Sequence, residues 1–370
     1  MSRFEPFRIT DLEPCPPWYQ VTLPEIEAMV AGLRHCRAEK LLEKENGHRI
    51  WAVFAGEQDF PEAKVNWSAA ASSPKPEFYK TSGYDPQCVV LAAGVHGSET
   101  EGVAAVMNMI ALMETGRDLR GKERPKLLEL LRQYRVVFLP CQNPDGRALT
   151  PDHLRGAKEE DQGRAGQGIW KNGKIIEWLE SKQYMPLPLD EVEFPGGYPN
   201  EDGINIMHDC APGALRSKEA AALLSNIEKW QPDLFLNLHS CGGLPEVLVP
   251  SWFNYPAHCR RGAELADKVH QVFLDNGAIK ALKNPPGIPI SCWINFNTAV
   301  SMVSGSLAIT FEASNHPDFS FDDMLEIHYM LVETMLEDGL KTPFSDRNHI
   351  IREEFFPTEP KYPNPTWRKV

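Results

Sequence analysis

The strongest constraint on the fold is a series of short apolar segments that each end at polar or glycine-containing sequence. The segments with this character are residues 50–54, 88–93, 134–140, 234–238 and 306–311. Their uniform hydrophobicity is typical of strands buried on both faces, as in parallel sheets. Amphipathic helical patterns lie between or after them, at residues 103–113, 217–230, 259–276 and 321–340. The sequence therefore predicts an α/β fold, a single domain with a mixed, largely parallel central sheet flanked by helices.

The predicted domain covers residues 22–341, and the segments on either side of it have a different character. Residues 1–21 are proline-rich and are expected to be irregular, and residues 342–370 form a Pro-rich C-terminal tail. Within the domain, residues 23–42 have the pattern of an opening helix. Loops without a clear periodic pattern are expected at residues 57–86 and 148–202, and the composition of residues 143–146, Asn-Pro-Asp-Gly, predicts a turn. The second of these loops is an insertion long enough to suggest a functional role.

The composition limits the classes of partner and compartment. A net charge of -13 argues against nucleic-acid and anionic-membrane surfaces. No segment approaches the roughly 18 apolar residues that span a bilayer, and the first residues lack the apolar core of a secretory signal. The 8 cysteines form no CxxC pair, which favours a reduced, cytoplasmic protein. The sequence does not define an oligomeric state.

Four acidic or imidazole side chains lie just past the ends of three predicted strands. His96 and Glu99 follow the strand at 88–93, His239 follows 234–238, and Glu312 follows 306–311. A histidine and a carboxylate three positions apart are by themselves a weak signal, and in isolation a polar turn that caps a strand is the more common explanation. However, open α/β sheets gather their sites at the carboxyl ends of strands, so these side chains are expected to converge. A histidine and a carboxylate placed like His96 and Glu99 can turn toward one point, and that geometry suits a zinc ion with an open coordination position.

The order of several motifs resembles the zinc carboxypeptidase superfamily, the group that includes carboxypeptidase A. The matching segments are AGVHGSETEG, FLPCQNPDGR, GINIMHD, PDLFLNLHS and AITFEAS. The resemblance covers roughly residues 22–340 and implies the carboxypeptidase fold. It also implies that His96, Glu99 and His239 bind one Zn²⁺ ion, and that Glu312 is the general base.

The chain departs from the family where the substrate is bound. The family segment normally reads GVDLNRNF, and its Asn-Arg pair grips the terminal carboxylate of a peptide. Here Met207 and His208 occupy those positions, and Asn205 replaces the aspartate that orients a metal-bound histidine. We expect His208 to contact the substrate and Asn205 to keep an orienting role.

For the basic residue that stabilises the oxyanion, the first candidate is Lys171, and Arg147 and Arg164 are alternatives. The resemblance implies a zinc metallopeptidase that cleaves an amide or peptide bond with metal-activated water and an altered grip on the substrate carboxylate. The substrate is expected to be a peptide, a modified peptide, a cell-wall fragment or an acylated amino acid. Two other functions stay open: an N-acyl amino acid deacylase of the aspartoacylase and succinylglutamate desuccinylase type, and a metal-containing binding protein without turnover.

Overall fold

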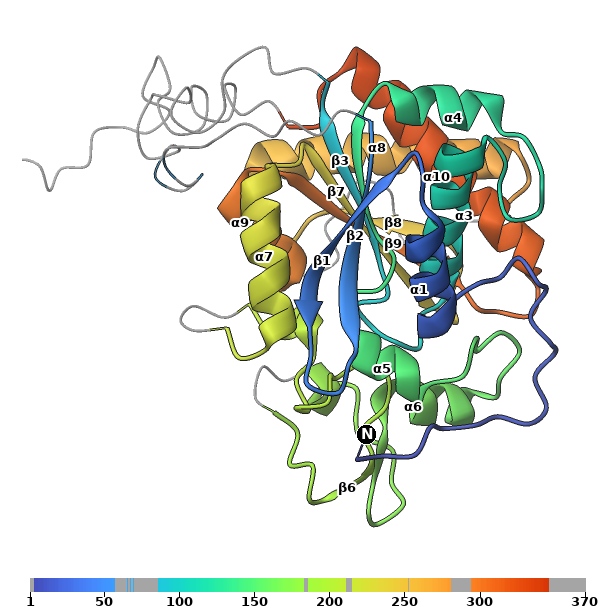
Figure 1. Cartoon of the computed structure of the whole chain (residues 1–370), viewed down its shortest axis with the longest axis vertical. Coiled ribbons are helices and arrows are strands. Elements are labelled where there is room, and N and C mark those ends of the chain that lie inside the picture. Colours follow the sequence, from blue (N-terminus) through green and yellow to red (C-terminus); the bar gives the residue numbers. More distant parts are fainter. Residues whose placement is uncertain are drawn as a thin grey trace, which may run out of the picture.

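The computed structural model describes residues 3–56, 65, 67, 69, 86–182, 186–210, 215–251, 253–280 and 294–345. A seven-stranded sheet in the order β1-β2-β4-β3-β7-β9-β8 forms the centre of this described part (Figure 1). Its strands are β1 Arg37–Glu43, β2 Arg49–Ala55, β3 Cys88–Ala93, β4 Arg135–Leu139, β7 Leu234–Cys241, β8 Glu246–Leu248 and β9 Leu307–Ser314. The inner strands β4, β3, β7 and β9 run parallel, whereas β1, β2 and β8 pair antiparallel with their neighbours. The predicted fold class is confirmed.

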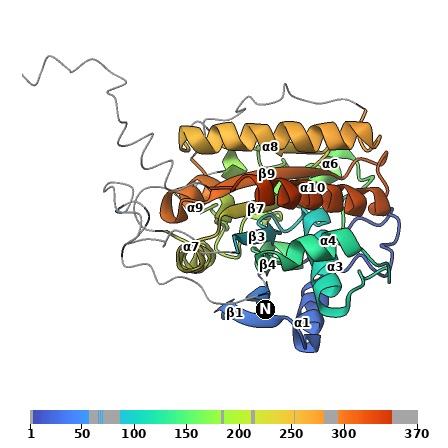
Figure 2. The ribbon, with the colours of Figure 1, turned by 90° about the horizontal axis from the view of Figure 1, so that it is seen from above.

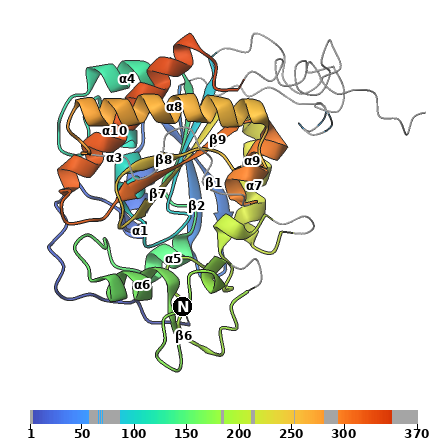
Figure 3. The ribbon, with the colours of Figure 1, turned by 180° about the vertical axis from the view of Figure 1, so that it is seen from behind.

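Helices cover both faces of the sheet (Figure 2). One face packs against α1 Leu23–Gly32, α3 Glu101–Thr115, α4 Pro125–Arg132, α8 Pro256–Asp275 and α10 Phe321–Lys341. The other face packs against α7 Lys218–Trp230 and α9 Phe296–Ser304. Figure 3 shows α8 crossing the face near β8 and β9, where it also contacts α10. None of the described helices combines the length and hydrophobicity that a bilayer crossing requires.

Alternation along the strands explains why the inner segments are apolar throughout. On β3, Val89 and Leu91 pack into the core beneath α3 and α10, whereas Val90 and Ala92 pack beneath α7 and α9. Successive side chains of a strand point to opposite faces, so a sheet covered on both sides must be apolar at every position. The same alternation assigns the polar residues at the strand ends to one face or the other.

Two predicted elements are wrong because pairing and local signals overrode the periodic pattern. The helix expected over residues 23–42 ends at Gly32, and the chain then forms the edge strand β1, which pairs with β2. The turn expected at Asn143–Gly146 is the start of helix α5 Pro144–Leu149, with the Asn143 side chain accepting a hydrogen bond from the backbone N–H of Gly146. Cross-strand partners are absent from any local pattern, so the first error could not be avoided from periodicity alone.

The insertion at 148–202 contains more regular structure than its sequence predicts. It includes α6 Glu159–Gln167 and a small sheet of β5 Ile169–Trp170 with β6 Val192–Phe194. These elements lie with α5 at one end of the central sheet (Figure 1). Two further elements, β8 and α9, were not predicted. The loop at 57–86 falls almost wholly outside the described residues, as does the tail beyond 345. The domain boundaries stay predictions.

A buried ion cluster joins the β1 end to the two helices beside the site. The Lys44 ammonium contacts the carboxylates of Asp145 on α5 and Glu219 on α7. Their side chains are only 3%, 2% and 0% exposed, respectively. Charges this far from water must be paired and hydrogen-bonded, so the cluster depends on all of its members.

Replacing Lys44 with methionine is expected to destabilise the protein by about 3–5 kcal/mol, because Asp145 and Glu219 would keep buried charges without their ammonium partner. Urea unfolding followed by circular dichroism measures the loss. The control is Lys40→Met on the same strand, whose partner Glu43 is 40% exposed. An exposed pair of this kind contributes about 0–1 kcal/mol. Equal losses in the two variants would contradict a structural role for the cluster.

Candidate metal centre and its pocket

A tight turn after β3 presents His96 and Glu99. Gly94 adopts φ 62°, in the left-handed region that favours glycine. Gly97 lies so close to the start of α5 that an added Cβ would be 2.0 Å from the Gly146 carbonyl carbon. The turn is therefore held against α5 by backbone contact, and α3 begins directly after it at Glu101.

The other two predicted residues lie side by side on neighbouring parallel strands. His239 on β7 is in register with Glu312 on β9. Because Leu238 and Phe311 belong to the core beneath α3 and α10, the alternation turns His239 and Glu312 to the opposite face. All four predicted residues thus face one cavity at the carboxyl ends of β3, β7 and β9.

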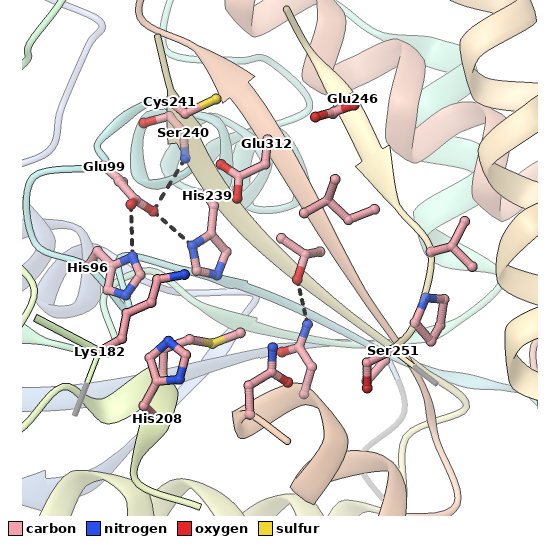
Figure 4. A pocket seen from close by; sticks show the side chains of 18 of the residues that line it. His96, Glu99, Lys182, His208, His239, Ser240, Cys241, Glu246, Ser251 and Glu312 are labelled. Atoms are coloured by element: carbon pink, nitrogen blue, oxygen red, sulfur yellow. Dashed lines mark hydrogen bonds and ion pairs between the residues drawn. The ribbon is translucent and has the colours of Figure 1, made fainter. Parts of the chain in front are cut away.

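Three ligand-type side chains converge in this cavity (Figure 4). Glu99 Oε1 lies 2.8 Å from His96 Nδ1, and Glu99 Oε2 lies 2.9 Å from His239 Nδ1. One ligand atom from each residue lies within 4.8 Å of the others, and all three residues are buried. No other group of this kind occurs among the described residues.

The hydrogen-bonding groups of His96, His239 and Glu99 cannot all be satisfied by one another, and this fits a bound cation. Both Nε2 atoms, of His96 and His239, are buried without a hydrogen-bond partner in the described structure. A neutral imidazole carries its proton on one nitrogen only. If that nitrogen is Nε2, two Nδ1 lone pairs face the carboxylate of Glu99; if it is Nδ1, two Nε2 lone pairs are left unsatisfied. A zinc ion between the Nδ1 atoms and Glu99 would remove the first conflict.

The two carboxyl groups of the site, Glu99 and Glu312, have different pKa values because their electrostatic surroundings differ. Burial would raise the pKa of Glu99, but the imidazoles of His96 and His239 outweigh it and lower that pKa to about 2. Burial raises the pKa of Glu312 to about 7, although His239 opposes the shift. Glu99 is thus a permanent anion, whereas Glu312 can exchange a proton near neutral pH. Two carboxyls with separated pKa values are a common mark of divided roles in catalysis.

The cavity has a volume of about 360 Å³. Five of the residues predicted from the sequence line it: His96, Glu99, His208, His239 and Glu312. Burial, together with the charge of Lys182, lowers the pKa of His208 to about 3. Its imidazole is therefore neutral near pH 7, and it can offer a hydrogen bond but no charge to a substrate.

The structure does not bring the predicted basic residues into the cavity. Lys171 is exposed at the end of β5, where its backbone N–H donates to the Glu191 carbonyl. Arg164 lies on α6 and pairs with Glu160. Lys171 is therefore solvated at the surface, and Arg164 forms an ion pair within its own helix. The sequence motif around Trp170 could not reveal either position.

Arg147 and Asn205 have structural positions instead. The Arg147 guanidinium is buried and donates to the backbone carbonyls of Gly97 and Thr150 at 2.7 and 2.6 Å. It therefore supports the turn that carries the candidate ligands. The Asn205 side chain accepts from the Met207 N–H and donates to the Ser181 carbonyl. Neither side chain lines the cavity, and the hydrogen bonds of the Asn205 side chain go to the backbone of Ser181 and Met207.

The sequence analysis missed several residues of the cavity, among them Lys182 and Tyr198. Lys182 ends the 3₁₀ turn Glu180–Lys182, and its ammonium lies 3.3 Å from the ring centroid of Trp178 while the side chain extends toward the two imidazoles (Figure 4). The ring centroids of Tyr198 and His96 lie 4.2 Å apart. Lys182 and Tyr198 both come from the insertion at 148–202. The only sequence signal was a lysine four positions after a tryptophan, which is too common to single out.

Comparisons with known proteins agree with this arrangement. The family model described as zinc carboxypeptidase matches residues 70–245, which include His96, Glu99 and His239. A metallo-carboxypeptidase from Burkholderia cenocepacia superposes with a TM-score of 0.54 at 14% identity, over 86% of this chain and 69% of that protein. Thrombin activatable fibrinolysis inhibitor superposes with a TM-score of 0.52 at 12% identity, over 88% of this chain and 76% of that protein. A search of curated protein sequences gave no match.

Proposed function

We propose that the chain is a member of the zinc carboxypeptidase superfamily, whose family model matches residues 70–245, and that it is a zinc-dependent hydrolase that cleaves an amide bond in a peptide. The observation that carries this proposal is the convergence of His96, Glu99 and His239, with Glu312 in register beside His239. This set provides three protein ligands and a separate buried carboxyl, as hydrolysis by an open metal site requires.

His96 and His239, through Nδ1, and the carboxylate of Glu99 would hold the ion. A bound zinc ion supplies Lewis-acid activation of water and of the scissile carbonyl. Glu312 would take a proton from the attacking water and later deliver it to the leaving amine. Its raised pKa, about 7, suits both halves of this exchange.

Lys182 is the proposed replacement for the missing Asn-Arg pair. It is the lysine of the cavity lining, where burial lowers its pKa to about 7 although the carboxylates of Glu312 and Glu99 favour its ammonium form. An ammonium is a compact point charge and cannot grip a carboxylate with two parallel hydrogen bonds as a guanidinium does. We therefore propose that Lys182 attracts the substrate carboxylate or the developing oxyanion, with His208 adding a neutral hydrogen bond.

Replacing Lys182 with methionine is expected to lower kcat/KM about 10–100-fold, because one charge-assisted contact to an anionic group is lost. Steady-state kinetics on a peptide with a free carboxyl terminus measures the effect. The matched control is Lys171→Met, which removes an exposed lysine of the same insertion and should leave kcat/KM unchanged. If the two variants behave alike, the assignment of the basic residue to Lys182 is wrong.

The pH dependence of kcat/KM should follow the proton of Glu312. The base is active as the carboxylate, so the rate should rise as the pH rises through its pKa. The rate should fall again at higher pH as Lys182, whose pKa burial lowers to about 7, loses its charge. The pKa of Glu312 is about 7 by burial, and a cation nearby favours the charged form and moves it lower. We expect an acid limb between pH 4.5, the ordinary value, and pH 7. A flat profile across this range would contradict the role of Glu312 as base.

The function is tested by incubating zinc-loaded protein with three substrate sets: peptides with free carboxyl termini, the same peptides amidated, and N-acyl amino acids. Mass spectrometry of the products then identifies the bond that breaks. Release of the terminal amino acid, abolished by a chelator and restored by zinc, supports the proposal. Release of a small acid from N-acyl amino acids would favour a deacylase instead. Stoichiometric zinc without any hydrolysis would favour a binding protein.

A further inference from the structure

A tyrosine from the insertion at 148–202 lies against a candidate metal ligand, and the proposed hydrolysis does not yet use it. The Tyr198 ring makes an interplanar angle of 33° with the His96 imidazole, and the two ring centroids are 4.2 Å apart. Tyr198 also lines the cavity that contains His96, His239 and Glu312. Its hydroxyl, the polar group of this side chain, is therefore a candidate to take part in the reaction.

Backbone contacts fix Tyr198 against the turn that carries the candidate ligands. The Gly97 N–H donates to the Gly197 carbonyl at 2.7 Å, and Asn143 Nδ2 donates to the Tyr198 carbonyl at 3.1 Å. Gly197 lies so close to the turn that an added Cβ would be 2.7 Å from the Ser98 backbone nitrogen. The position of the phenol is therefore set before any substrate binds, as electrostatic stabilisation of a transition state requires.

The Tyr198 hydroxyl has a proton that it can donate to a bound molecule. Among the residues that the structure describes, none forms a hydrogen bond with this hydroxyl, and its oxygen is not one of the unpaired atoms sealed from solvent. Burial, together with the carboxylates of Glu99 and Glu312, holds the pKa of Tyr198 well above its usual range. The phenol therefore stays protonated near neutral pH, and both carboxylates are within electrostatic reach of it. A donor in this position suits an acceptor that enters the cavity with the substrate.

The charged donor of the cavity offers something different. Burial lowers the pKa of Lys182 to about 7, so only about half of the molecules carry this charge at pH 7. A phenol keeps its proton across the pH range in which Lys182 titrates. The lysine can therefore attract the substrate carboxylate, whereas the tyrosine offers a fixed, neutral hydrogen bond that does not depend on pH in this range.

We propose that the Tyr198 hydroxyl donates a hydrogen bond to the oxygen of the scissile carbonyl as that oxygen gains negative charge, with the stacked ring holding the hydroxyl in place. Tyr198 is then a catalytic residue, and Lys182 is left to the substrate carboxylate. The inference rests on the proposed function, because the acceptor is the carbonyl that the enzyme attacks.

The hydrogen bond acts in both halves of the reaction and transfers no proton itself. When the water oxygen bonds to the carbonyl carbon, Glu312 takes a proton from the water, and the π electron pair moves to the carbonyl oxygen. When the C–N bond breaks, that pair re-forms the C=O bond and Glu312 gives the proton to the leaving amine. A donor that binds the charged oxygen more strongly than the neutral one lowers the barrier and so raises kcat.

Steady-state kinetics on a peptide with a free carboxyl terminus gives the first test, because Tyr198→Phe removes the hydroxyl and keeps the ring. In the zinc-loaded protein we expect kcat to fall about 10²-fold, the cost of one lost donor of this kind, with KM nearly unchanged. Zinc affinity, measured by competition with a chelating dye, should not change because the ring against His96 remains. The control is Tyr19→Phe, whose hydroxyl binds Thr100, directly after Glu99, but does not line the cavity. It should leave kcat unchanged.

Binding of a tetrahedral anion gives a second test that needs no turnover. A peptide analogue with a phosphonate in place of the scissile amide carries negative oxygens where the reacting carbonyl would develop charge. Calorimetry on the zinc-loaded protein should show that Tyr198→Phe weakens phosphonate binding about 10–100-fold, as the loss of a hydrogen bond to a charged group does. The free terminal amino acid lacks this group and should bind equally to both proteins. Tyr19→Phe should bind the phosphonate as the unchanged protein does.

The two tests separate the failure of this inference from the failure of the proposed function. If peptides are cleaved but Tyr198→Phe changes neither kcat nor phosphonate affinity, the role of Tyr198 is wrong and the hydrolase proposal stands. If no peptide is cleaved but the variant weakens phosphonate binding, the hydrolase proposal fails and Tyr198 remains the donor to a tetrahedral anion. Weaker zinc binding by Tyr198→Phe would overturn the inference, since the hydroxyl would then act on the ligands. Neither cleavage nor phosphonate binding by the zinc-loaded protein would overturn both proposals.

Discussion

Replacing Glu312 with glutamine is expected to lower kcat by about 10²–10⁴-fold, the usual contribution of a positioned general base. The amide keeps the size and shape of the carboxyl but cannot accept a proton from water. Because Glu312 is not among the three converging ligand residues, the variant should still bind one zinc ion per chain. Turnover of a free-carboxyl peptide and metal analysis of the same preparation measure the two effects.

The control for this substitution is Glu337→Gln, on an exposed carboxylate of α10 whose partners are surface lysines. It should leave kcat unchanged. Near-complete activity of Glu312→Gln would remove the residue from the reaction. Loss of zinc from the variant would instead make Glu312 a ligand, and the division of roles proposed for the two carboxylates would be wrong.

The second large effect is expected from Glu99, whose two oxygens face both imidazoles. Glu99→Gln should weaken zinc binding by more than the roughly 10–100-fold that the loss of an outer hydrogen-bond partner costs. It should also abolish the rise in melting temperature that zinc gives to the unchanged protein, because a ligand that binds only the folded state stabilises it. Competition with a chelating dye and thermal scans with and without zinc measure both quantities.

Glu101→Gln is the matched control for this experiment. Glu101 is two positions further along the chain and is also buried, but it does not belong to the converging ligand set. It should bind zinc nearly as well as the unchanged protein. If Glu99→Gln and Glu101→Gln bind zinc equally, the metal centre does not lie where the imidazoles meet.

The parts of the fold that could be predicted are those in which local sequence and packing agree. Strands β3, β4, β7 and β9 are apolar on both faces because helices cover both sides of the sheet. The edge strand β1 has exposed and half-buried residues and resembles an amphipathic helix, so only its pairing with β2 identifies it. Strand β8 has three residues, too few for a periodic signal.

The same distinction applies to the site. His96, Glu99, His239 and Glu312 could be predicted because each lies at the end of a recognisable buried strand, and the sheet then fixes their meeting point. The position of Lys182 depends on how an insertion with little periodicity packs on the strand ends, and Lys171 carried an equally plausible local sequence. Glu246 also lines the cavity, and it was missed for a related reason, since its short strand β8 is defined only by its neighbour β9.

The central claim is tested most directly by anomalous diffraction at the zinc edge from crystals of the zinc-loaded protein. The account predicts one strong peak about 2.0–2.2 Å from the Nδ1 atoms of His96 and His239 and from a carboxylate oxygen of Glu99. It also predicts that the Glu312 carboxylate lies outside the coordination sphere. A peak elsewhere, or no peak at this site in zinc-saturated crystals, would contradict the account.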